Sequence, residues 1–124
     1  MTAVYNIAYC NYVLDQGARG VGSMAGKIMG IMITKYANQE HIAGATRAAA
    51  KAGHPVRIFL NDEGVRFTRD PLFLELLKLD GVDCTVCDHS CERLGIHEKT
   101  AGINYGSQND NAGMLHHSER ILVF

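Results

Sequence analysis

Three of the four cysteines, Cys84, Cys87 and Cys91, lie within eight residues of one another. A thiolate, and not a neutral thiol, attacks other sulfur atoms and binds metal ions. The first cationic side chain is Arg19, so the N-terminal residues lack the positive region of a secretory signal, and we expect a cytoplasmic protein. In such a reducing compartment, a cysteine cluster indicates thiol chemistry or metal binding before it indicates a structural disulfide.

Cys87 stands where a strand is predicted to end and a helix to begin. Val82, Cys84 and Val86 alternate with residues of the opposite face, which predicts a strand over residues 82–87. A thiol at this junction meets unpaired backbone N–H groups and the positive end of a helix dipole, and both favour the thiolate. Cys87 is therefore the candidate nucleophile, able to attack a persulfide or disulfide and hold the transferred sulfur.

Cys91, His89 and Arg93 follow on the short helix predicted over residues 88–94. Cys91 comes four residues after Cys87, so the two sulfurs could approach across one helical turn, with Cys91 as a resolving thiol. A protonated His89 would stabilise the thiolate further, and Arg93 could place a cation beside the sulfur or a bound anion. The candidate catalytic residues are Cys87, Cys91 and His89.

A second polar segment follows the strand predicted over residues 56–60. It contains Asn61, Asp62 and Gly64. In open parallel sheets, ligands bind beyond the carboxyl ends of the strands, where Cys87 is also expected. We therefore take Asn61, Asp62 and Gly64, together with Arg93, as candidate ligand-binding residues.

Other interpretations of the cysteines stay open. The C-x-x-x-C spacing with one intervening histidine supplies at most three zinc ligands, and His97, His116 or His117 could complete a site only through the tertiary fold. We expect no metal and no cofactor. Cys84 faces the other side of its strand and is interpreted as a packing residue; the same reading stays open for Cys87, since a cysteine near a strand end is commonly a small buried apolar residue.

Extended and helical patterns alternate from residue 27 onward. Asn38 offers an N-cap to a helix ending at Gly53, and Asp70 offers one to a helix whose first residue is Pro71. The alternation predicts an α/β fold, a three-layer α/β/α sandwich with a mostly parallel sheet of about five strands. Strands are expected at residues 28–33, 56–60, 82–87 and 120–124, a polar loop at 61–64, core-facing leucines and Phe73 at 72–79, and further helices at 88–94 and around 111–117.

The composition is that of one folded domain. The 124 residues are 47% hydrophobic and 20% charged, with a formal net charge of −1, so no basic field would attract nucleic acid. No apolar run approaches the roughly 20 residues that span a bilayer, so we expect no membrane association. Residues 1–26 are interpreted as an N-terminal arm and 27–124 as the regular domain. The glycines of the arm do not form a phosphate loop, because the run from Gly22 to Lys27 is one residue short of that motif and continues into Ile28.

Four segments in order resemble the DsrE/DsrF-like (DsrEFH) sulfur-relay family. The stretch VCDHSCERLGI, residues 86–96, is similar to the family's signature, in which a cysteine after the third strand is followed eight residues later by glycine. The other three are AGHPV with IFL in residues 52–60, NDEGV in residues 61–65 and SERILVF in residues 118–124. Many members pair their cysteines as C-x-x-C, whereas this chain has C-x-x-x-C.

The resemblance implies a DsrEFH-like sandwich, usually assembled as trimers or hexamers, in which the residue matching Cys87 carries sulfur as a persulfide. The leading hypothesis is a sulfur carrier, sulfurtransferase-like if active, that takes sulfur from a donor protein and passes it to an acceptor protein. The alternatives are a thiol redox protein that uses a Cys87–Cys91 pair and an oligomeric small-ligand-binding module with incidental cysteines. Tyr5, Tyr9 and Tyr12 make the arm a candidate for self-association.

Overall fold

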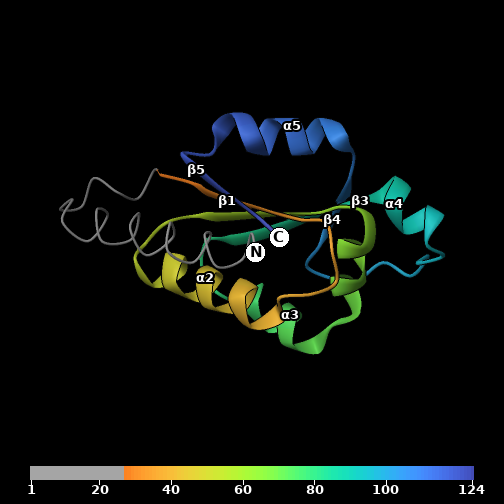
Figure 1. Cartoon of the computed structure of the whole chain (residues 1–124), viewed down its shortest axis with the longest axis horizontal. Coiled ribbons are helices and arrows are strands. Elements are labelled where there is room, and N and C mark those ends of the chain that lie inside the picture. The colour runs from red at the N-terminus through yellow and green to blue at the C-terminus, as the bar shows by residue number, and fades with distance from the viewer. Residues whose placement is uncertain (1–26) are drawn as a thin grey trace.

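A computed structural model describes residues 27–124, so the predicted arm and its glycine segment lie outside the described residues. Five parallel strands form one sheet in the order β4-β3-β2-β1-β5. The predicted α/β/α sandwich is confirmed: α2 and α3 cover one face and α5 the other (Figure 1). The elements are β1 (Met29–Ile33), α2 (Gln39–Lys51), β2 (Val56–Leu60), η2 (Asp62–Arg69), α3 (Pro71–Leu76), β3 (Val82–Cys87), α4 (Asp88–Arg93), β4 (Asn104–Gly106), α5 (Gln108–His117) and β5 (Arg120–Val123).

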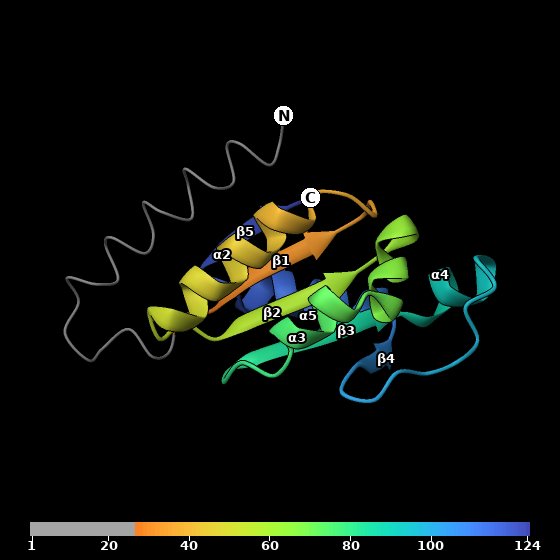
Figure 2. The same ribbon diagram turned by 90° about the horizontal axis from the view of Figure 1, so that it is seen from below.

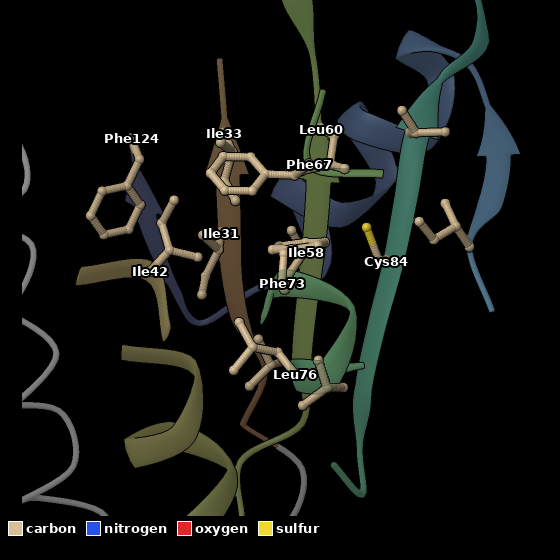
Figure 3. Close-up of a cluster of buried hydrophobic side chains, with 14 of the residues drawn as sticks. Ile31, Ile33, Ile42, Ile58, Leu60, Phe67, Phe73, Leu76, Cys84 and Phe124 are labelled. Atoms are coloured by element: carbon tan, nitrogen blue, oxygen red, sulfur yellow. The ribbon is translucent and has the colours of Figure 1, made fainter. Parts of the chain in front are cut away.

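The principal hydrophobic core lies between the sheet and the layer of α2 and α3 (Figures 2 and 3). Alternate residues of three adjacent strands point into it, as the two-residue period of a strand requires. Ile31, Ile58 and Cys84 lie side by side there, and each is at most 2% exposed. Phe73 and Leu76 of α3 pack on them. Burial of this apolar layer fixes the register of the strands and therefore where each strand ends.

Within residues 27–124, α5 is the helix that covers the opposite face of the sheet. Gly30 of β1 lets the C-terminal end of α5 approach the sheet closely. A side-chain carbon at this position would lie 2.6 Å from the Ser118 hydroxyl and 2.7 Å from the Met114 sulfur. Ser118 in turn donates its hydroxyl to the Met114 carbonyl at 2.6 Å. The contact fixes the C-terminal end of α5, and therefore the direction in which its N-terminus points.

The two N-cap residues named from the sequence, Asp70 and Asn38, behave differently in the structure. Asp70 caps α3 as expected, with its carboxylate accepting from the N–H groups of Leu72 and Phe73. Asn38 precedes α2 but makes no capping bond with its side chain, so that part of the prediction is wrong. Its backbone is in the left-handed region, with φ of 63°, and it is the Asn38 carbonyl that accepts from Ile42 N–H. Asparagine tolerates this conformation better than most residues.

Three local features differ from the expectations. The segment predicted as a polar loop after β2 is a helical turn, η2, of eight residues. Strand β4 was not predicted, and it completes the sheet beside β3. Leu72 was expected to face the core, yet it is 77% exposed, because it lies in the first turn of α3 and the core is reached by Phe73 and Leu76 instead.

None of the helices in residues 27–124 combines the length and the hydropathy needed to cross a bilayer.

Candidate functional site

The carboxyl ends of β2, β3 and β4 lie next to one another and open onto a cavity of about 820 Å³. Parallel pairing brings this about, since all three strands end at the same edge of the sheet. Residues at the start of η2, in α4, at the end of β4 and at the start of α5 form the walls. Cys87 lines this cavity, and α4 and β4 lie at the same end of the molecule in Figure 2.

Cys87 is the last residue of β3 and immediately precedes the first turn of α4. The residue is 3% exposed, and burial alone raises the pKa of its thiol. Hydrogen bonds from the Ser90 hydroxyl and backbone and from the Gln108 side chain outweigh that effect. The His89 backbone N–H adds to them, and the pKa of Cys87 falls below its ordinary value. The thiolate is therefore stabilised by donors fixed in place and not by exposure to water.

A chain of polar side chains positions these donors. The Ser90 hydroxyl lies 3.1 Å from Asn61 Oδ1, and Gln108 Nε2 donates to the same oxygen at 3.0 Å. A hydroxyl has a single proton, so Ser90 donates it to Asn61 or to the Cys87 sulfur but not to both at once. Asn111 Nδ2 donates to Gln108 Oε1 at 3.2 Å, which fixes the orientation of the Gln108 amide. The amide N–H groups of Gln108 consequently face Asn61 and the cysteine sulfur. Ser90 and Gln108 thus reach the sulfur from two different helices, and Asn61 links them.

Asp62 and Arg93 tie the start of η2 to α4. Arg93 Nη2 lies 2.9 Å from Asp62 Oδ1. The Asp62 N–H donates to the Ser90 hydroxyl at 3.2 Å. Both residues line the cavity, so the structure brings these two ligand candidates together with Asn61 and Cys87. Since the pair is half exposed, we assign it to positioning and not to a large share of the stability.

Cys91 lies in different surroundings from Cys87. It is 1% exposed and belongs to the hydrophobic core. Burial raises its pKa, and the negative charges of Asp88 and Cys87 raise it further, against a smaller lowering by Lys99. Cys84 is wholly buried in the same core, and burial raises its pKa strongly. Of the three cysteines in residues 27–124, only Cys87 has a lowered pKa and lines the cavity.

Of the two remaining candidate residues, His89 lines the cavity and Gly64 does not. His89 is exposed and lines the cavity, and its backbone N–H reaches the Cys87 sulfur. Gly64 does not line the cavity. A side-chain carbon there would lie 2.2 Å from the Ile33 carbonyl oxygen, so glycine allows η2 to pack against the end of β1. Gly64 thereby helps to fix the start of η2 beside the site.

Ser90 and Gln108 were not singled out from the sequence. Ser90 stands three residues after the last strand residue, a position whose side chain returns toward the start of a helix, so its spacing from Cys87 held a usable signal. Gln108 is reached only through β4 and the Ser107–Asp110 capping box that begins α5. Because β4 was not predicted, there was no reason from the sequence to expect Gln108 near Cys87.

Across residues 27–124, no group of three or more His, Cys, Asp or Glu side chains is arranged to hold a metal ion.

A sequence profile of the DsrE/DsrF-like family matches residues 27–124. Among solved structures, the crystal structure of the ychN protein from E. coli is similar, with a TM-score of 0.61 and 18% sequence identity. The alignment covers 79% of this chain and 98% of that one. At this identity the similarity concerns the fold. No curated protein sequence matches the chain.

Proposed function

Because the chain belongs to the DsrE/DsrF-like family, whose members act in sulfur relay, we propose that it holds sulfane sulfur as a persulfide on Cys87. The observation that carries the proposal is the lowered pKa of Cys87 beside a cavity. A thiolate at neutral pH reacts with sulfur electrophiles, and a cavity gives a donor access to it.

Loading and unloading are two exchanges at sulfur. The Cys87 thiolate attacks the outer sulfur of a donor persulfide, a Cys87–S bond forms, the donor's S–S bond breaks, and the donor leaves as a thiolate. An acceptor thiolate then attacks the outer sulfur on Cys87, and Cys87 leaves as a thiolate. No net oxidation or reduction takes place. The donors that stabilise the Cys87 thiolate also make it a good leaving group in the second exchange.

The neighbouring residues have separate roles in this scheme. Ser90 and Gln108 hold the sulfur and its negative charge through hydrogen bonds. Asn61 positions both of them. The Asp62–Arg93 pair holds the adjoining wall. His89 contributes its backbone N–H, and its exposed ring lies at the cavity where a partner would arrive.

Mass spectrometry after treatment with a sulfane donor tests the proposal. Trypsin leaves all three clustered cysteines on one peptide, Leu79 to Arg93, so fragment ions must assign the added sulfur atom. We expect the addition on Cys87, its loss in Cys87→Ser, and its retention in the matched variant Cys91→Ser. Sulfur on Cys91 with Cys87 unmodified would reverse the assignment.

Redox cycling of a Cys87–Cys91 disulfide is the second candidate. It is favoured by the closeness of the two sulfurs, since the charge of Cys87 acts on Cys91. It is opposed by the burial of Cys91 in the core. Under a mild oxidant this mechanism predicts the loss of two free thiols and no added sulfur, whereas the carrier loses neither.

The partners follow from the chemistry: a protein that donates persulfide sulfur and one that accepts it. The trimer or hexamer implied for the family stays a prediction for this chain, and light scattering during size-exclusion chromatography tests it.

A further inference from the structure

The wall of the Cys87 cavity carries an excess of negative charge. Among the described residues, Asp62, Asp88, Glu92 and Asp110 line it, against one permanently charged cation, Arg93. Arg93 is paired with Asp62. The remaining three carboxylates therefore dominate the charge that an approaching molecule meets.

The two carboxylates of α4 are the least compensated. Asp110 accepts from the Ser107 N–H at 2.8 Å within the capping box of α5. Asp88 and Glu92 are exposed and form no ion pair within the described part of the chain. They are four residues apart and so share one face of α4. Lys99 does not line the cavity, and its Nζ lies 5.1 Å from the centre of the ring of Tyr105, which does.

The negative charge of the cavity wall acts on any charged molecule that enters the cavity to react with Cys87. A thiolate on Cys87 adds a further negative charge at the base of the cavity. An anionic thiol or persulfide carrier meets repulsion as it enters, whereas a cationic one is attracted, and this changes association rates most at low salt. The cavity is open to solvent on the side of Asp88 and Glu92, so mobile ions screen the effect.

We propose that the sulfur partner of Cys87 presents its thiol or persulfide beside positive charge, as a protein cysteine flanked by lysine or arginine. The inference rests on the proposed function for the identity of the cargo. The charge selectivity itself concerns any sulfur electrophile that enters the cavity, so it can be measured without persulfide.

The test compares two disulfides of similar size, the dication cystamine and the dianion 3,3′-dithiodipropionate. Near neutral pH and at low salt, Cys87 attacks one sulfur, the mixed disulfide forms and the other half leaves as a thiolate. The rate ratio, cation over anion, is divided by the same ratio for free cysteine, which removes the intrinsic reactivity of each reagent. We expect a quotient of about ten in the native protein. It should fall toward one at high salt.

The variants Asp88→Asn and Glu92→Gln test whether these two carboxylates cause the preference for the cationic disulfide. Combined, they should lower the quotient by roughly threefold or more. Glu75→Gln on α3 is the matched control, because Glu75 is exposed, pairs with Lys78 and lies away from the cavity. Using a ratio cancels any change in the pKa of Cys87 that the substitutions cause.

A quotient near one in the native protein, or one that the double variant leaves unchanged, overturns the inference. These outcomes are distinct from failure of the carrier function. Charge selectivity without sulfane loading would refute the carrier and leave the cationic preference standing, whereas loading without selectivity would do the reverse.

Discussion

Cys84 and Cys87 lie on the same strand, three residues apart, and both are almost completely buried, at 0% and 3% exposure. Their pKa values nevertheless move in opposite directions. Cys84 points into the apolar layer beneath α2 and α3, where no donor compensates the lost hydration (Figure 3). Cys87 ends the strand among the donors of Ser90, His89 and Gln108. Burial alone does not decide the state of a thiol; the hydrogen-bond donors around it do.

Cys91 extends the comparison to α4. It is four residues from Cys87, on the first helix after β3, yet it packs with the same core as Cys84. One helical turn therefore separates a thiol whose pKa is lowered from one whose pKa is raised. The difference lies in the surroundings: Cys87 lines the cavity, whereas Cys91 packs in the hydrophobic core.

The largest expected effect is the contrast in reactivity. In the native protein, iodoacetamide should modify Cys87 at least about a hundredfold faster than Cys84, because Cys84 is neutral and enclosed. Fragment ions of the peptide Leu79–Arg93 resolve the two sites. Similar rates at both cysteines would show that opening of the fold, and not the native site, governs the reaction.

Serine substitutions separate the two environments by stability. Cys84→Ser places a hydroxyl without a partner in the core and should lower the free energy of unfolding by about 1–3 kcal/mol. Cys87→Ser is the matched change, and its hydroxyl can use the same donors, so its cost should stay within about 1 kcal/mol. Urea denaturation measures both. Equal losses would mean that the surroundings of Cys87 are as apolar as those of Cys84.

The smallest of the three expected effects is that of Gln108→Ala, because it removes a single hydrogen bond to the sulfur. Loss of one hydrogen bond, worth about 1 kcal/mol, raises the pKa of Cys87 and should slow its alkylation at fixed neutral pH by about fivefold. Asn109→Ala is the control, since Asn109 is the next residue of α5 and its side chain is exposed. A rate unchanged by Gln108→Ala would remove this residue from the site.

The sequence was sufficient for the layers and for the position of Cys87. Strands β1, β2 and β3 are apolar runs or clear alternations, and their ends bring Asn61 and Cys87 to one edge of the sheet. The sequence was insufficient for β4 and η2, whose formation depends on contacts with distant parts of the chain. Strand β4 has three residues, too few for a period to be visible, and its pairing with β3 carries Gln108 to the sulfur. The eight-residue η2 depends on contact with β1 at Gly64, which no local pattern encodes.

The pH dependence of Cys87 alkylation tests the central claim most directly. Only the thiolate reacts, so the rate follows its fraction. Since the folded pKa of Cys87 is lowered, the native rate should rise and level off at a lower pH than that of the same cysteine in urea-unfolded protein. A native profile that coincides with the unfolded one, or lies at higher pH, would contradict the account.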